Sequence, residues 1–182
     1  AWPVQLRWNG VNRANAGLPQ YGHHVLVEPI NGEWAARHFP DDPNGNVYRG
    51  SRYPWTANLS YRGTNPVTYI NEGYSKTSNQ SENDWTDLFN LTWALNDTNS
   101  PSYVQGVERN ANVRMFMRYF AVCTLVDYME TSLCRGVGDD YAMYRGLKDP
   151  RFLLIPHDFD TILGQGDTPG NPNRTLFPML NP

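Results

Sequence analysis

The chain has 182 residues, 40% of them hydrophobic and 13% aromatic, so it can bury a core and is not a disordered chain. Its formal net charge of −3, without any run of Lys or Arg, argues against binding to nucleic acid or to an anionic membrane surface. No apolar stretch approaches the roughly 20 residues of a membrane-spanning helix, so no membrane span is expected. The chain begins at Ala1 rather than Met, and we expect a trimmed or partial product.

The first part of the chain predicts short strands and one short helix. A strand is expected over His23–Ile30, where Val and Leu favour extended backbone and a proline ends the pattern. The segment "NGEWAARHF" predicts a short helix with Asn31 as its N-cap. The turn signal "DDPNG" precedes a strand around Val47–Arg49, and another strand is predicted at Val67–Ile70.

Two helices are predicted next. The segment "NDWTDLFNLTWALND" has Asn83 or Asp84 as its N-cap and an apolar face made of Trp85, Leu88, Phe89 and either Trp93 or Thr92. A long helix is predicted over Val107–Leu133, ended by Gly136 and Gly138. The apolar spacing predicts that one wide face of this helix is buried, with Val113, Phe116, Met117, Phe120, Ala121, Thr124, Leu125 and Tyr128.

The last structured part predicts a β-hairpin. Two strand-like runs, Tyr141–Gly146 and Arg151–Pro156, are separated by the turn signal "LKDP". Residues 165–182 are rich in Pro and Gly and predict a loop or tail. Strands, then helices, then a hairpin indicate an α+β fold in one domain over residues 1–164.

Carboxylates flank the predicted hairpin. Asp139 and Asp140 precede its first strand, and Asp158 and Asp160 follow its second strand. Because these two ends are neighbours in an antiparallel hairpin, four carboxylates converge there and repel unless a cation or a proton offsets them. Mg²⁺, which prefers carboxylate oxygens, is a natural partner. The alternative is that these residues only cap and solvate the turns.

The order of helix, glycine loop, acidic residue, hairpin and acidic residue is also the order of a kinase C-terminal lobe. The segment "LLIPHDFDTILG" resembles the "iPWDlDxtfG" signature of the CotH kinase family, with His157 in the place of Trp. Just upstream, "GDDYAMYRG" resembles the family's "NNYYLYRD" segment.

The resemblance extends over roughly residues 21–164. The segment "YGHHVLVEPINGEWAARHFPDDPNGNVYRG" resembles "GvYgLvEnID..FL...F....GnlYKG", and the helical block also matches. Arg49 stands in the position of the family's Lys. The residues that match this motif are Glu28, Asn46, Tyr48 and Gly50.

This resemblance implies an atypical protein-kinase-like fold, with a helical C-lobe that carries the hairpin and part of an N-lobe sheet. It also implies use of ATP and Mg²⁺ (or Mn²⁺) to phosphorylate Ser or Thr of a protein substrate, a secreted or coat protein. The place of action would then be extracellular or at the cell or spore surface.

The family's roles are carried over residue by residue. Asp158 and Asp160 are the implied metal ligands, of which either one could ligate directly. Asp139 and Asp140 are the implied catalytic pair, as a ligand or beside the nucleophile. Glu28 is the implied cofactor-binding residue, which orients a phosphate-binding Lys or contacts the nucleotide.

Two departures from the family pattern support a second hypothesis. Family members carry an earlier "RxRGNSS…K" stretch with phosphate-contacting Lys and Arg, and this chain begins after that point. The segment "SLCRGVG" occupies the place of the family's catalytic-loop Asp, so either Asp139 has taken over as base or the base is absent. The alternative is therefore a catalytically inactive kinase-like module with a structural or binding role in an extracellular or coat assembly.

Other chemistries have weaker support. Zinc held by His157 with His23 or His24 and an Asp is an alternative, but no His or Cys pair has zinc-ligand spacing. Glu28 with an Asp could form a glycosidase-like pair, yet the aromatic residues fit a core better than a sugar-binding surface. Acyl transfer is disfavoured because the chain has no Gly-x-Ser-x-Gly motif.

Overall fold

The computed structural model describes residues 2–4, 7–12, 24–51, 54, 56–128, 133, 138–159 and 162. The chain divides into two compact units, Ala1–Ile30 and Asn31–Pro182. Residues 165–182, for which a tail is predicted, lie outside the described residues, and the predicted domain over 1–164 stays a prediction.

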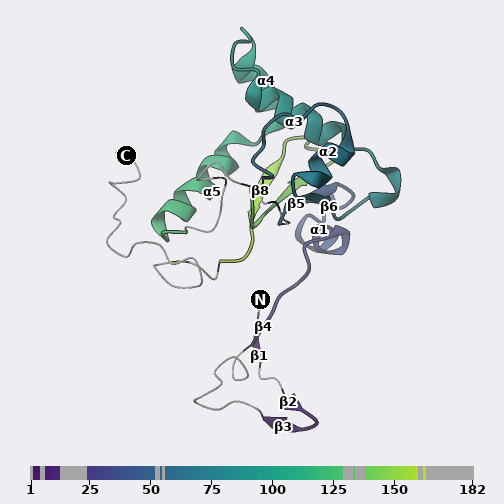
Figure 1. The fold of residues 1–182 in the computed structure, drawn as a ribbon, viewed down its shortest axis with the longest axis vertical. Helices are drawn as coiled ribbons and strands as arrows, with labels where there is room; N and C mark the ends of the chain where they lie inside the picture. The colour runs from purple at the N-terminus through teal and green to yellow at the C-terminus, as the bar shows by residue number, and fades with distance from the viewer. Residues whose placement is uncertain are drawn as a thin grey trace. The chain divides into compact units, whose positions relative to one another are not determined.

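The first unit is made of two short antiparallel strand pairs (Figure 1). One pair joins β1 (Trp2–Val4) to β4 (His24–Leu26), and the other joins β2 (Arg7–Trp8) to β3 (Val11–Asn12). Both Asn9 and Gly10 have positive φ angles, 50° and 79°, as the Asn-Gly turn of a tight hairpin requires. The predicted strand over His23–Ile30 is shorter in the structure, which ends β4 three residues before Pro29.

The second unit contains a four-stranded antiparallel sheet in the order β6-β5-β7-β8. Its strands are β5 (Asn46–Gly50), β6 (Tyr74–Lys76), β7 (Tyr141–Arg145) and β8 (Leu153–Pro156). The predicted hairpin is confirmed, since β7 and β8 pair directly, and so is the strand around Val47–Arg49.

Two short helices lie before and after β5. The helix α1 (Gly32–His38) confirms Asn31 as an N-cap, because its side chain accepts a hydrogen bond from the Trp34 N–H at 3.0 Å. The predicted strand at Val67–Ile70 is wrong, since these residues lie in α2 (Pro66–Asn71). The β-branched residues there favoured a strand, but an Asn cap and a Pro at the first position start a helix.

The predicted long helix over Val107–Leu133 is wrong, because the structure breaks it into two. The helix α4 (Tyr103–Asn110) ends before Ala111, and α5 (Val113–Leu125) begins after Asn112. At the break, the backbone bonds to the hairpin instead: the Asn112 N–H donates to the Phe152 carbonyl at 2.9 Å, and the Phe152 N–H donates to the Asn110 carbonyl at 2.8 Å.

A 3₁₀ turn (η2, Gln80–Glu82) and the helix α3 (Thr86–Asn96) precede α4. Neither predicted N-cap of α3 occupies the cap position, which is Trp85. The Asp84 carboxylate nevertheless accepts from the Thr86 N–H at 2.9 Å, so it serves the same first turn.

The core lies between the sheet and the helices α3 and α5, and Figure 1 shows α5 beside β8. The sheet contributes Tyr48, Tyr141, Met143 and Leu154, and the helices contribute Leu88, Leu91, Phe116, Tyr119 and Cys123. The predicted buried face of the long helix is partly wrong, because Met117 and Leu125 are 56% and 64% exposed. The buried face of α5 is centred on Phe116, Tyr119 and Cys123, which are spaced by three and four residues, and Met117 and Leu125 lie outside this narrower face.

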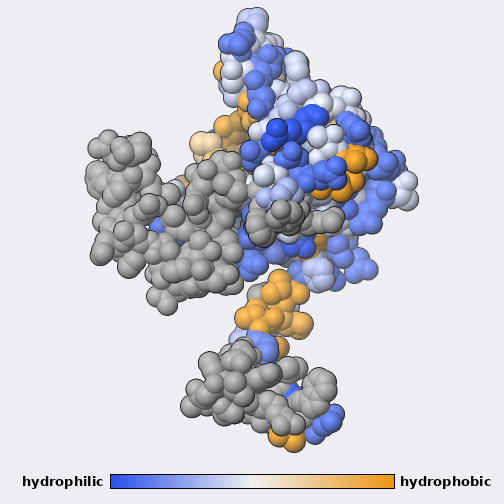
Figure 2. Space-filling model, in the orientation of Figure 1, coloured by the Kyte–Doolittle hydropathy of each residue, from blue (hydrophilic) through white to orange (hydrophobic). Residues whose placement is uncertain are grey.

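The coloured surface of the second unit is largely hydrophilic in the view of Figure 2, with hydrophobic colour limited to small patches. Among the helices of the described part of the chain, none is both long enough and apolar enough to cross a membrane.

Candidate functional site

The entrance to β7 is held tightly against the segment at residues 56–57. Gly138 forms an isolated bridge with Thr56, and a Cβ atom at Gly138 would overlap the backbone of Ala57. Three residues later, the Tyr141 hydroxyl donates a hydrogen bond to the Ala57 carbonyl. Asp139 and Asp140 lie between these two anchors, so their backbone position is set by the packing on each side.

The backbone just after β8 is bonded to Tyr128, which lies three residues after the end of α5. Tyr128 is 1% exposed, and its hydroxyl lies 2.8 Å from the carbonyl oxygens of both His157 and Asp158. Its ring also packs on Phe159, with ring centroids 4.5 Å apart. The hydroxyl of one buried tyrosine therefore connects the helical block to the end of the hairpin.

The pairing of β7 with β8 brings the two ends together. Tyr141 pairs with Pro156, so the residues just outside the pair, Asp140 and His157, are neighbours. One carboxylate oxygen each from Asp140 and Asp158 and one ring nitrogen of His157 all lie within 4.8 Å of one another. The predicted convergence of carboxylates is confirmed for Asp140 and Asp158, whereas Asp160 lies outside the described residues.

The backbone of both clustered carboxylates is left-handed. Asp140 has φ 48° and Asp158 has φ 56°. Asp and Asn tolerate this region better than other non-glycine residues because their short side chains bond locally. A larger or β-branched residue at either position would strain the backbone as well as remove an oxygen ligand.

Asp139 lies at the edge of this cluster and is half-buried. Burial raises the pKa of its carboxyl, and the negative charge of Asp158 raises it further. The Asp140 N–H, which donates to the Asp139 carboxylate at 3.0 Å, acts in the opposite direction. Asp139 is therefore close enough to Asp158 for the two charges to interact.

Arg49 approaches the cluster from the neighbouring strand β5. One of its terminal nitrogens, Nη2, lies 2.9 Å from Nε2 of His157. Burial lowers the pKa of His157, and the charge of Arg49 lowers it further, against an opposing effect of Asp158. The contact itself also favours a neutral ring, because an arginine N–H needs an acceptor nitrogen on the imidazole.

The residues present fit a hard divalent cation. Asp140 and Asp158 offer carboxylate oxygens, the ligands that Mg²⁺ and Mn²⁺ prefer. The zinc alternative needs His23 or His24 beside His157, and the structure does not support it. His23 lies outside the described residues, and His24 belongs to the first unit.

Glu28, the predicted nucleotide contact, also belongs to the first unit, where it lies two residues after β4 ends at Leu26. Its role stays a prediction, as do the roles of the four aspartates.

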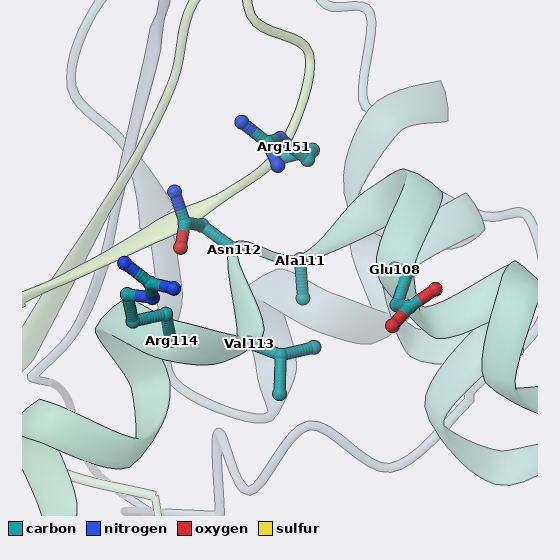
Figure 3. Close-up of a pocket in the computed structure, with 6 residues that line it drawn as sticks. All are labelled: Glu108, Ala111, Asn112, Val113, Arg114 and Arg151. Atoms are coloured by element: carbon teal, nitrogen blue, oxygen red, sulfur yellow. The ribbon is translucent and has the colours of Figure 1, made fainter.

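A separate polar cleft lies where α4 ends and α5 begins (Figure 3). Arg114 and Glu108 lie on opposite sides of it in this view, and Arg151 borders it. Arg151 is already paired with Asp149, at 2.7 Å. The cleft lies beside the start of β8, whereas Asp158 follows the end of β8. The cleft and the carboxylate cluster are therefore separate sites.

Sequence reasoning missed three residues that build the site: Gly138, Tyr128 and Arg49. The sequence pattern predicts Gly138 to be a helix terminator and Tyr128 to be part of an apolar helix face. Arg49 stands in the position of the lysine in the "GnlYKG" pattern, and this match is a signal that the position needs a positively charged side chain.

A family model described as CotH kinase protein matches residues 1–178 of the 182-residue chain. The search of curated proteins gives no match.

Proposed function

Because the chain belongs to the CotH kinase family, we infer that it transfers the γ-phosphoryl group of ATP to a Ser or Thr hydroxyl of a protein. The observation that carries this proposal is the meeting of the Asp140 and Asp158 carboxylates at the open end of the hairpin. Phosphoryl transfer depends on positioning and on neutralising phosphate charge, and acidic residues that hold a divalent cation serve both purposes.

Asp140 and Asp158 would hold Mg²⁺ or Mn²⁺, with Asp160 retained as a further predicted ligand. When bound, the cation neutralises charge on the phosphate oxygens. Asp139, half-buried beside the pair, is the candidate base. The hydroxyl oxygen forms a bond to the γ-phosphorus, the bond from that phosphorus to ADP breaks, and the hydroxyl proton passes to the Asp139 carboxylate.

The same reasoning extends to the fold and the setting. The hairpin and the helices α3 to α5 would form the C-lobe of a kinase-like fold, and β5, which carries part of the family's N-terminal motif, pairs with β7 in the same sheet. A secreted, coat or surface protein is the proposed substrate, and an extracellular or surface location is proposed with it. The second candidate, an inactive kinase-like module, is favoured by the segment "SLCRGVG" in the place of the family's catalytic-loop Asp.

Thermal stabilisation tests cation and nucleotide binding. At a ligand concentration about 100-fold above Kd, Mn²⁺ with ATP should stabilise the fold by about 2.7 kcal/mol, which is a Tm rise of about 5–10 °C. Asp140→Asn and Asp158→Asn should lose most of this rise. Asp149→Asn is the matched control, because Asp149 lies in the same hairpin at its exposed turn and pairs with Arg151.

Transfer itself is measured with ATP labelled at the γ-phosphate and a mixture of Ser- and Thr-containing peptides. Incorporation that needs Asp158 supports the kinase. No Tm rise in the unmutated chain contradicts the kinase and is the result expected of the inactive module. Binding of ATP without any incorporation also contradicts the kinase activity of this chain.

A further inference from the structure

We propose that Arg49 is a positioning residue: it holds the His157 ring as a hydrogen-bond donor, so that the cation site of Asp140 and Asp158 contains only oxygen ligands. Such a site selects Mg²⁺ or Mn²⁺ over Zn²⁺. The selectivity part of this inference rests on the proposed cation site, whereas the state of the His157 ring does not.

The sheet register brings the two side chains together. Arg49 pairs with Ala142 in β7, and Ala142 pairs with Ile155 in β8. Because side chains alternate along a strand, Arg49 and Ile155 lie on the same face of the sheet, and His157 follows two residues later. The observed contact between Arg49 Nη2 and His157 Nε2, at 2.9 Å, is the result.

The direction of this hydrogen bond follows from the chemistry of arginine. A guanidinium group carries only N–H donors and stays protonated in proteins, so Nε2 of His157 must be the acceptor. A neutral imidazole has one acceptor nitrogen and one N–H, so the ring proton lies on Nδ1. Both nitrogens are then occupied, and the ring has no lone pair left for a metal ion.

The surroundings agree with a donor at Nδ1. This nitrogen is buried, and within the described residues it has no hydrogen-bond partner. A buried N–H in a ring of this cluster can serve an oxygen atom of a bound phosphate, which would satisfy it. A metal ligand at the same atom would instead require the proton to leave Nδ1 and the Arg49 contact to break.

The consequence for metal choice is direct. Zn²⁺ prefers nitrogen and sulfur ligands, whereas Mg²⁺ and Mn²⁺ are satisfied by carboxylate oxygens and water. Without Arg49 the ring proton can lie on either nitrogen, so a lone pair of His157 becomes available and the site then resembles a mixed nitrogen and oxygen site. We expect Arg49→Met to shift the ratio of Zn²⁺ to Mn²⁺ affinity about tenfold or more towards Zn²⁺, the scale on which residues behind a metal ligand act.

The ring state is tested first, without metal, by long-range ¹H–¹⁵N NMR of the histidine rings. The chain has four His residues, so His157→Asn assigns the signal. The wild-type chain and Arg49→Lys should show the proton on Nδ1, and Arg49→Met should show a mixture or the other tautomer. Arg145→Met, at the opposite end of β7, should leave the signal unchanged. A proton on Nε2 in the wild-type chain, or no change in Arg49→Met, overturns the inference.

The metal environment is tested second, by pulsed electron paramagnetic resonance of bound Mn²⁺. The wild-type chain should show no coupling to an imidazole ¹⁴N nucleus, and a direct coupling would overturn the inference. His157→Trp, whose indole offers an N–H and no lone pair, should keep Mn²⁺ affinity within a few-fold; a loss of about 100-fold would identify His157 as a ligand. If Mn²⁺ binds to none of these proteins, the proposed function fails, and the NMR result still decides the role of Arg49.

Discussion

At the scale of single residues, buried hydroxyl groups do much of the positioning. Tyr128 and Tyr141 each place a hydroxyl on backbone carbonyls at one side of the carboxylate cluster. Carbonyl oxygens buried away from water need such donors, and losing one typically costs about 1–3 kcal/mol. The position of the aspartates therefore depends on tyrosines whose hydroxyl groups bond to the backbone.

We predict that Tyr128→Phe lowers the free energy of unfolding by about 1–3 kcal/mol and weakens Mn²⁺ binding about tenfold. The ring still fills its place, but the carbonyls of His157 and Asp158 lose their shared donor. Urea unfolding and Mn²⁺ titration by electron paramagnetic resonance measure the two effects. Tyr103→Phe is the control, because the Tyr103 hydroxyl donates a longer hydrogen bond, of 3.4 Å, to the Leu95 carbonyl between α3 and α4. Equal Mn²⁺ affinity in both variants would contradict the positioning role of Tyr128.

The sequence predicts which residues lie together where residue type and order along the chain are sufficient to place them. Asp140 and Asp158 could be placed together because a hairpin joins their two ends. Tyr128 and Arg49 could not be placed, because their polar partners lie far along the chain and depend on packing between elements. The sequence shows that Tyr128 can be buried, but it does not show which carbonyl meets its hydroxyl.

At the scale of elements, close backbone approach decides how β7 begins. We predict that Gly138→Ala destabilises the fold by about 1–3 kcal/mol or more, because its Cβ would overlap the backbone of Ala57. Gly106→Ala is the opposite case: Gly106 lies in α4, and a Cβ atom added there would meet the Ala94 Cβ at 4.0 Å, an ordinary contact distance. That variant should be more stable by up to about 1 kcal/mol, since Ala favours helix. Thermal unfolding of the two variants gives the comparison, and a neutral Gly138→Ala would contradict the tight packing.

The turn between β7 and β8 is closed by Asp42, whose carboxylate accepts from the N–H groups of Leu147, Lys148 and Asp149 at 2.9, 2.9 and 3.2 Å. Burial acts to raise the pKa of Asp42, but these N–H groups and the charge of Lys148 outweigh it, so the pKa lies below its usual range. A lowered pKa means that the stabilisation is complete above the unfolded-state value of about 3.9 and is lost as the pH falls through the folded-state value.

We therefore predict that Asp42→Asn costs roughly 0.5–2 kcal/mol at pH 7, the range known for side chains that cap helix N–H groups. The cost should shrink as the pH falls below about 4, because the wild-type carboxylate then becomes protonated. Denaturant unfolding at pH 7 and pH 3 measures the difference. A cost that stays constant with pH would show that the charge of Asp42 does not matter.

Prediction of elements from sequence was reliable where local signals agreed with packing. The hairpin and α1 have turn or cap residues that match their structure. The long helix failed because its apolar spacing continues across Ala111 and Asn112, where backbone bonds to Phe152 replace helical ones. Such a tertiary bond leaves no mark in the local pattern.

At the scale of the whole molecule, the core cluster of the described residues lies entirely within the second unit. We predict that residues 31–182 alone unfold cooperatively, with a Tm within a few degrees of that of the longer chain. If Glu28 contacts the nucleotide as predicted, the shortened chain keeps Mn²⁺ binding and loses ATP affinity. Circular dichroism melts and ATP titration test both statements, and a shortened chain without a cooperative transition would contradict the first.

The α+β class and the family were both visible in the sequence, because they depend on element order and on several ordered motifs. The division at Ile30 was not visible. It depends on which residues pack together, and the matching motif runs straight across it.

The strand order has a consequence for biosynthesis. The strand β7 lies between β5 and β8, although it is made long after β5: Gly45 and Tyr144, which bond to each other, are 99 residues apart in the chain. Pairing across such a distance is slow, because a long loop must close before its contacts form. On the ribosome, β5 therefore has one edge without its final neighbour until β7 emerges. Asp140 and Asp158 come together only in the same late step, so the proposed cation site would not exist in a nascent chain before its sheet is complete.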